Sequence, residues 1–255
     1  MALDDRHNTY VTAGTAFESP TSTELVSLPG GVIGLNRDLG PQRAVSVEWG
    51  FRGRQRIAEY SLAVYRITVR DALIQAREQD GRAFFQNAGR TRHQGIEAGL
   101  QVRPLTGLSL QGAWTLSDLG FTRFRVTNGG VTDTLDGNRL PGVPLHQLRL
   151  GVRSALGPVT LDLDQTLTGA VWADDRNTQQ AASWGAGITG LRATWALGNG
   201  RLGGQPFVGV ENLFNRRYIS AVTVNGFGGR VFEPGASRQI HAGATFDLGN
   251  WSTGR

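Results

Sequence analysis

The sequence predicts an all-β fold, an antiparallel transmembrane β-barrel, and three observations lead to it. Apolar and polar residues alternate along many segments, which is the pattern of a strand with one apolar face. Charged residues stay off the apolar face of the clearest segments. The connections are long and short in turn, which gathers the long loops at one end, as in membrane barrels. A soluble β-sandwich shares the alternation but has no reason for this order of loops.

About ten strands are expected. The clearest has Leu108, Leu110, Gly112, Trp114 and Leu116 on one face, with small or polar residues on the other. The same alternation is found at 45–52, 96–103, 147–153, 191–197 and 239–248, and more weakly in the first strand, Thr9 to Phe17. Several of these segments approach the roughly ten residues that a tilted strand needs to cross a bilayer.

The connections and the aromatic residues set the orientation. Long connections are expected at 17–42, 72–82, 127–144, 173–183 and 215–237, and short ones at 53–54, 104–106, 155–157 and 199–204. With the long loops outside, the residues near the periplasmic strand ends are Trp49, Phe51, Tyr60, Trp195 and Phe246, and Trp172 comes near the outer rim. Aromatic rings favour both interfaces of a membrane barrel, although Trp114 is expected to lie deeper.

Composition excludes several other classes. No segment of the 255 residues has the long apolar run of a membrane-spanning helix. The absence of cysteine rules out a disulfide framework and a thiolate metal site. All 26 basic residues are arginine, against 21 acids, giving a formal charge of +5. Because these arginines are scattered and often stand beside acids, no nucleic acid partner is expected.

Five motifs occur in order along nearly the whole chain. They are the runs at 14–25 (GTAFESPTSTEL), 39–50 (LGPQRAVSVEWG), 86–97 (QNAGRTRHQGIE), 137–144 (GNRLPGVP) and 210–218 (VENLFNRRY). Together they resemble the C-terminal part of the β-barrel of TonB-dependent outer-membrane receptors, of the ferric-siderophore type. Two departures are visible: Gln42 stands where the family usually has Glu, and Phe246 is followed by further residues, whereas the family usually ends on that aromatic residue.

The resemblance implies a fold and a set of partners. Residues 1–255 would be the last strands of a twenty-two-strand barrel, without its N-terminal plug and without a secretory signal, so we expect a fragment of a longer chain. The full receptor would bind a ferric siderophore or similar ligand at the cell outer membrane, and the TonB complex would drive uptake by contacting the plug. Outer-membrane lipid and the barrel-assembly machinery would be further partners, and no cofactor is implied.

Other interpretations remain open at this stage. A passive porin or an adhesin-type outer-membrane barrel would explain the strands but not the ordered motifs, and a soluble β-rich binding protein would turn its polar face outward. About ten strands would also leave two unpaired edges that lipid cannot satisfy. We favour missing sequence as the source of the remaining strands, over a smaller closed barrel or an unstable product.

No catalytic or metal site is expected. The run Gly185 to Gly190 matches a dinucleotide-binding spacing, but the next residues alternate as a strand rather than a helix. The four histidines share no metal-ligand spacing, and the acids Asp133, Asp136, Asp174 and Asp175 fit solvated loops better than a calcium site. No Ser/His/acid set is nominated, so an enzyme is not predicted.

Candidate ligand contacts come from the predicted outer loops. They are Phe17, Trp172, Arg176, Tyr218, Phe227 and Arg230. Arginines and aromatic rings suit an anionic, aromatic iron chelate, because they offer charge-assisted hydrogen bonds and stacking.

Overall fold

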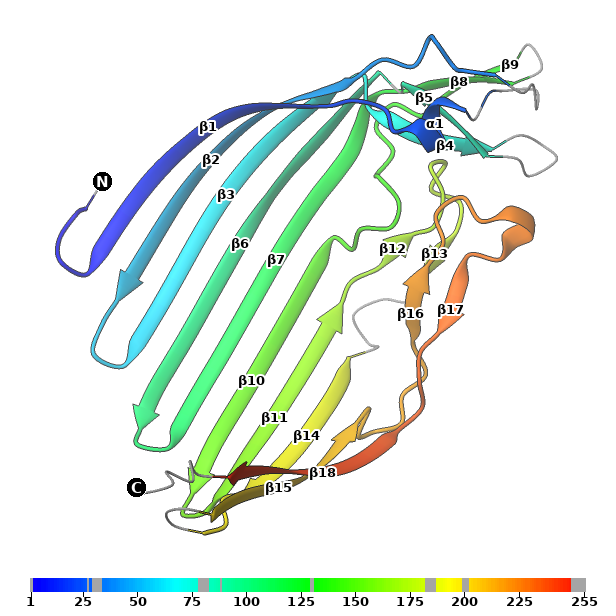
Figure 1. Ribbon diagram of the computed structural model, residues 1–255. Helices are drawn as coiled ribbons and strands as arrows, with labels where there is room; N and C mark the ends of the chain where they lie inside the picture. The colour runs from blue at the N-terminus through cyan, green and yellow to red at the C-terminus, as the bar shows by residue number, and fades with distance from the viewer. Residues whose placement is uncertain are drawn as a thin grey trace, which may run out of the picture.

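A ten-stranded antiparallel sheet forms most of the protein (Figure 1). The computed structural model describes residues 2–26, 28, 34–77, 83–87, 89–128, 131–181, 187–198 and 202–248. In spatial order the strands are β1 (His7–Glu18), β2 (Gln42–Arg54), β3 (Ala58–Arg70), β6 (Arg90–Leu105), β7 (Leu108–Arg123), β10 (His146–Leu156), β11 (Val159–Thr168), β14 (Ile188–Trp195), β15 (Leu202–Glu211) and β18 (Gln239–Leu248). The predicted number of strands is confirmed, and the weakly patterned first strand extends beyond its predicted bounds.

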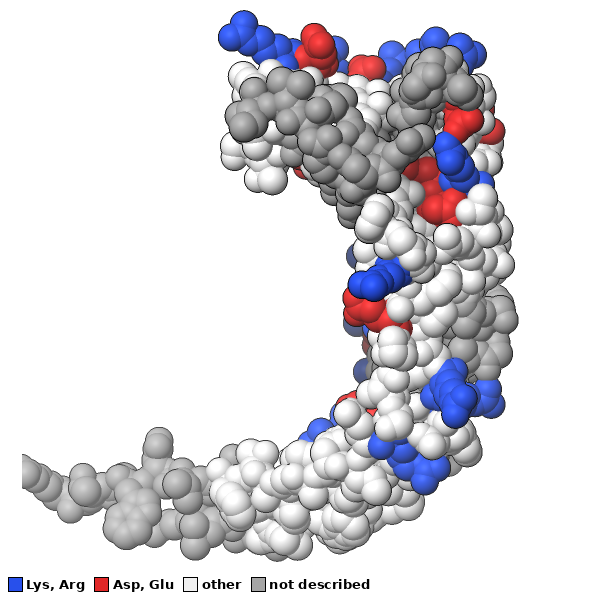
Figure 2. All heavy atoms as spheres, turned by 90° about the vertical axis from the view of Figure 1, so that its right-hand side faces the viewer, with Lys and Arg blue, Asp and Glu red and all other residues white. Residues whose placement is uncertain are grey.

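The sheet curls into an open trough with a C-shaped profile (Figure 2). Strands β1 and β18 are its two edges, and the described strands do not close into a smaller barrel of their own. Some of the charged side chains in Figure 2 lie along the inner edge of the C, and others lie elsewhere on the visible face. A polar concave face and an apolar convex face are what a segment of membrane-barrel wall requires.

Cross-strand register assigns residues to the two faces. On the convex face, Trp49 pairs with Val64, Val64 with Ile96, and Ile96 with Leu116. Val11 and Ile240 on the same face are 70% and 72% exposed. On the concave face, Arg153 pairs with Asp162 at 2.6 Å, and the Arg192 guanidinium lies 3.6 Å from the centroid of the Phe207 ring. Within the segments on which the prediction rests, such as 45–52 and 96–103, the separation of charged and apolar faces is confirmed.

All the long connections emerge at one end of the sheet, which we call the loop end (Figure 1). The β1–β2 connection contains helix α1 (Ser22–Leu25). Each of the next four carries a small hairpin: β4 (Leu73–Arg77) with β5 (Ala83–Asn87), β8 (Arg125–Asn128) with β9 (Val131–Thr134), β12 (Val171–Trp172) with β13 (Gln180–Ala181), and β16 (Ile219–Val222) with β17 (Phe232–Pro234). A short 3-10 helix, η3 (Phe227–Gly229), lies between β16 and β17. No helix in the described ranges is long and apolar enough to cross a membrane.

The opposite end, the turn end, has short connections between successive strands. The first three turns fall slightly later than expected, because β2 continues to Arg54, β6 to Leu105 and β10 to Leu156. The fourth falls earlier, because β14 ends at Trp195 and β15 begins at Leu202. Trp49, Phe51, Tyr60, Trp195 and Phe246 lie toward this end, as the orientation argument predicted. The predicted alternation of long and short connections is therefore confirmed.

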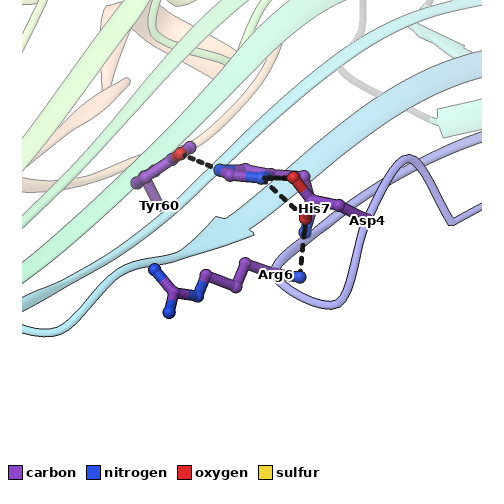
Figure 3. A network of polar contacts seen from close by, with 4 residues as sticks. All are labelled: Asp4, Arg6, His7 and Tyr60. Carbon is purple, nitrogen blue, oxygen red and sulfur yellow. Dashed lines mark hydrogen bonds and ion pairs between the residues drawn. The ribbon is translucent and has the colours of Figure 1, made fainter.

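An aromatic cluster of His7, Phe51 and Tyr60 joins the first three strands near the turn end. Figure 3 shows His7 and Tyr60 of this cluster with Asp4. The His7 ring stacks on Phe51 with centroids 6.0 Å apart, and His7 Nε2 lies 2.7 Å from the Tyr60 hydroxyl oxygen. His7 Nδ1 contacts the Asp4 carboxylate at 2.8 Å. The hydrogen bond from His7 lowers the pKa of Asp4. The cluster holds the start of β1 against β3 across β2.

A small apolar core supports the loop end. Phe121 and Phe124 are 2% and 1% exposed and pack with Leu135, with Ile74 and Leu140 at the periphery. The two phenylalanine rings have centroids 4.7 Å apart. Burial at this point fixes the base of the connection between β7 and β10.

Candidate functional site: the interlocked loops

Hydrogen bonds from polar side chains hold the long connections in place at the loop end, and we call each group of such bonds a tie. The first tie lies within one connection, and the other three join different connections. In the first connection, the Thr21 hydroxyl accepts a bond from the Glu24 amide while the Glu24 carboxylate accepts one from the Thr21 amide, at 2.6 Å. This capping box explains the Pro-Thr-x-x-Glu run physically, because it satisfies free N–H groups at the start of α1.

The second tie joins the first connection to the β3–β6 connection. Asn87 Oδ1 accepts from the Gly40 amide at 2.8 Å, and Asn87 Nδ2 donates to the Gly40 and Asp71 carbonyls. Gln42 Oε1 accepts from the Leu73 amide at 3.1 Å. An amide side chain at position 42 also donates to Glu18, a bond that a carboxylate could not make.

The third tie joins the β7–β10 and β11–β14 connections. Asn177 Oδ1 accepts from the Arg139 amide at 2.8 Å, and Asn177 Nδ2 donates to the Arg139 carbonyl at 2.9 Å. Asn138 Nδ2 donates to the Asp175 carbonyl, and the Gly142 amide donates to the Trp172 carbonyl. The Gly-Asn-Arg-Leu-Pro-Gly motif is therefore the half of this tie that lies after β9.

The fourth tie extends the same assembly to the β15–β18 connection. Asn225 Nδ2 donates to Asp175 Oδ2 at 2.8 Å, and its Oδ1 accepts from the Asp175 amide at 3.1 Å. The Asn225 amide donates to the carbonyl of Ala173, which is fully buried. Burial raises the pKa of Asp175, with a smaller opposing contribution from the Asn225 hydrogen bond. Three connections thus form one body.

Two asparagines close the neck of the last connection. Asn212 is 3% exposed, donates to the Arg216 and Ala236 carbonyls, and accepts from the Arg216 amide. Asn215 accepts from the Arg238 amide at 2.9 Å. Both have positive φ, 51° and 49°, a conformation that asparagine tolerates better than most residues. The Glu-Asn-Leu-Phe-Asn motif therefore places two residues that can turn the chain and bridge it at once.

The predicted contact residues fall at different places in this assembly. Trp172 lies in β12 at the third tie. Arg176 is exposed beyond β12 and forms an ion pair with Asp133 of β9. Phe227 and Arg230 lie at the exposed tip around η3, with Phe227 62% exposed.

Tyr218 and Phe17 are separated from that tip. Tyr218 precedes β16 and lines a cavity of about 210 Å³ with Asp164, Glu211 and Gln239. Phe17 is 76% exposed near the end of β1, and its register with Arg43 puts it on the convex face, away from the trough. Trp172 and Arg176 share one connection and Phe227 and Arg230 another, and the two connections meet through Asn225. The assignment of all six to a ligand stays a prediction.

The family follows from comparison with known proteins. The sequence matches the family described as "TonB dependent receptor-like, beta-barrel" over residues 2–213. The chain belongs to the TonB-dependent receptors. The receptors of this family are proteins of the outer membrane. The ten-stranded sheet described above matches part of their barrel.

Solved structures of receptors share the fold at low identity. The chain resembles the ferric yersiniabactin uptake receptor FyuA from Yersinia pestis at 20% identity and a TM-score of 0.72, covering 96% of this chain and 35% of that one. The siderophore receptor PiuA from Acinetobacter baumannii matches at 17% and 0.75, covering 96% and 34%. The copper transporter OprC matches at 18% and 0.74, covering 96% and 37%. The chain spans about a third of the length of these receptors.

The interlocked loops lie at the loop end of the sheet, beyond the strands that form the trough. Exposed guanidinium groups and rings on a braced support can bind an anion or a planar chelate without ordering long loops first. The described residues contain no group of three or more potential metal ligands.

The sequence arguments against a nucleotide site have a partial structural test. Residues 185 and 186 of the glycine run lie outside the described residues, but Ile188–Trp195 is strand β14 and not the helix that a dinucleotide fingerprint requires. The hydrogen bonds of the asparagines were not predicted, although Asn87, Asn138, Asn212 and Asn215 stand inside the motifs; Asn177 and Asn225 stand outside them. The available signal was the glycine next to Asn138 and to Asn225, because asparagine and glycine together favour turns.

Proposed function

We propose that this chain forms wall and outer loops of a receptor that takes up an iron–siderophore complex across the outer membrane, with energy relayed through TonB from the inner membrane. The observation that carries the proposal is the braced assembly of three connections, which presents Arg176, Phe227 and Arg230 to solvent. Two of the three similar structures named above are, by their names, receptors for iron complexes or siderophores. The TonB complex, the barrel-assembly machinery and membrane lipid are the corresponding partners.

The test uses the full-length receptor, purified from outer membranes. Ferric chelates of catecholate, hydroxamate and phenolate type are titrated while tryptophan fluorescence is followed. Arg176→Ala combined with Arg230→Ala should weaken binding of the preferred chelate by about tenfold or more, because hydrogen bonds to charged groups contribute about 1.5–3 kcal/mol each.

The matched control is Arg54→Ala combined with Arg56→Ala, which removes the same charge at the turn end. Unchanged affinity in the loop variant would take both arginines out of the binding site. A receptor that binds none of the chelates would contradict the iron part of the proposal.

Transport distinguishes the receptor from a passive porin. Uptake of the bound chelate into cells should stop when TonB is deleted. Uptake that continues at the same rate without TonB would favour the passive barrel.

A further inference from the structure

Six arginines gather on the convex face at the loop end, although they are scattered in the sequence. Arg43 pairs with Arg70, Arg70 with Arg90, and Arg90 with Arg123, so four arginines form one row across β2, β3, β6 and β7. The last pair lies beyond a register shift between Arg90 and Thr91. Arg92 and Arg66 lie in the next two rows toward the turn end. We call these six residues the arginine surface.

The faces of these residues follow from the register. Arg43 lies two residues before Val45 and four before Val47, whose side chains are 54% and 50% exposed on the convex face. Arg66 pairs with Val47 and with Gln94, which keeps it on that face. The arginine row is thus part of the outer wall and does not point into the trough.

The arginine surface is strongly unbalanced in charge. Asp118 is the one acid in these three rows; Arg92 pairs with it at 3.2 Å and Gln94 donates to the same carboxylate. Within the described ranges, the other five arginines make no ion pair, and all five are exposed. Like charges directly opposite each other destabilise a sheet, so an anionic partner would offset that repulsion.

A groove adjoins the row. It has a volume of about 800 Å³ and is lined by Phe17, Pro41 and Val45 together with Arg43 and Arg70. Its lining is mostly apolar and includes the two arginines. This combination fits a molecule with an acyl chain and a phosphorylated head.

The apolar band begins in the row after Arg66. There the convex face carries Trp49, Val64, Ile96 and Leu116, followed by Phe51, Leu62, Ala98 and Trp114. Side chains that cover the hydrocarbon core thus end where the arginines start. In a receptor oriented as proposed above, that level is the headgroup layer of the outer leaflet.

We propose that the arginine surface binds the phosphate groups of outer-leaflet lipid, with an acyl chain seated in the groove beside Phe17. Guanidinium groups bind phosphate in a bidentate manner, which lysine cannot do, and all basic residues of this chain are arginine. The proposal rests on the outer-membrane orientation in the proposed function, but not on the transported ligand.

The test compares lipids on the full-length receptor in neutral detergent. The probe is lipid A, a diglucosamine lipid with two phosphates, and its fully dephosphorylated form is the comparison; bound lipid is counted by native mass spectrometry. The variant replaces Arg43, Arg70, Arg90 and Arg123 with glutamine. It should bind lipid A at least about tenfold more weakly than the natural protein, because each basic residue at an anionic lipid surface contributes about 1 kcal/mol, or roughly fivefold.

Two further variants keep the result interpretable. Arg52, Arg103, Arg149 and Arg153 changed to glutamine remove the same charge from the concave face and should leave lipid A binding unchanged. If the fourfold row variant fails to assemble, judged by heat-modifiable gel mobility, the double variant Arg70→Gln with Arg90→Gln tests the centre of the row.

Four outcomes would overturn the proposal. The row variant could bind lipid A as the natural protein does, the natural protein could fail to distinguish lipid A from its dephosphorylated form, or inorganic phosphate alone could compete as well as the lipid, which would indicate a free-anion site. Co-purification of an acidic protein bound to the arginine surface in place of lipid would also overturn the proposal. Loss of lipid binding with intact chelate binding separates this surface from the uptake site, and failure of chelate binding alone rejects only the uptake proposal.

Discussion

The loop end and the turn end of the same sheet are held together by different kinds of contact. At the turn end, short turns and the His7, Phe51 and Tyr60 rings hold adjacent strands together locally. At the loop end, side chains such as Asn177 and Asn225 join connections that are far apart in sequence. The strands are therefore joined by short turns and local contacts alone, whereas the conformation of the long connections depends on the hydrogen bonds of a few buried or half-buried side-chain amides.

The largest effect is expected for Asn212→Ala, which removes three hydrogen bonds and places alanine at a φ of 51°. We expect a loss of about 3 kcal/mol in the opening free energy of the last connection, from buried unsatisfied groups and backbone strain. Hydrogen exchange over residues 212–238 measures it. Asn212→Gly keeps the backbone freedom, so it should lose less. Equal exchange in natural protein and Asn212→Ala would contradict the neck role.

A smaller effect is expected for Asn177→Ala, which breaks the reciprocal pair with the Arg139 backbone. The half-buried site and its φ of 55° give a loss of about 2 kcal/mol. Protease nicking of the β11–β14 connection should then become faster while the strands stay protected. The exposed Thr178→Ala is the neighbouring control and should leave nicking unchanged.

The effect of Asp175→Asn should depend on pH. Burial raises the pKa of Asp175 above its ordinary value of 3.8, so its contribution to stability is fully present below that value and is lost as pH rises through the raised pKa. At neutral pH the buried carboxylate disfavours the closed loops, and asparagine can still accept from Asn225. The variant should exchange more slowly than the natural protein at neutral pH and alike at low pH. Faster exchange at neutral pH would show that the charge itself is needed.

The smallest effect is expected at the turn end, for Tyr60→Phe. It removes one half-exposed hydrogen bond to His7 but keeps the ring contacts, so the loss should be about 0.5 kcal/mol.

Because the pKa of Asp4 is lowered, the Asp4–His7 link should persist above pH 3.8 and weaken as pH falls through the lowered value. Exchange of the amides of residues 6 and 7 against pH measures the link. A loss as large as that of Asn212→Ala would erase the contrast between the ends.

Sequence reasoning placed the strands and their faces well, for a physical reason. A period of two is imposed by the pleat itself, so segments such as 108–117 show their apolar side without knowledge of their neighbours. The rhythm of connections was visible because turns and loops differ in length. The hairpins inside the loops were not predicted, since short strands such as β12 owe their conformation to tertiary contacts.

Contacts between distant segments could not be predicted in the same way. Asn225 and Asp175 are 50 residues apart, and nothing local links them. The arginine row depends on the register of four strands, and a slip of one residue would turn each side chain to the other face. For that reason arginines judged scattered along the chain prove to be aligned in space, and Phe17, assigned to an outer loop, lies on the convex wall beside them.

The neck formed by Asn212 and Asn215 also bears on how such a protein can diversify. The bridges fix both ends of the connection, while the tip at Phe227–Gly229 is exposed and includes Gly228 at a positive φ. The tip can therefore be exchanged independently of its base. A peptide of different length or charge could be grafted between residues 226 and 230 while the hydrogen bonds of Asn212 and Asn215 stay unchanged. In that way the residues exposed at the loop tip can change without any change in the ten-stranded sheet.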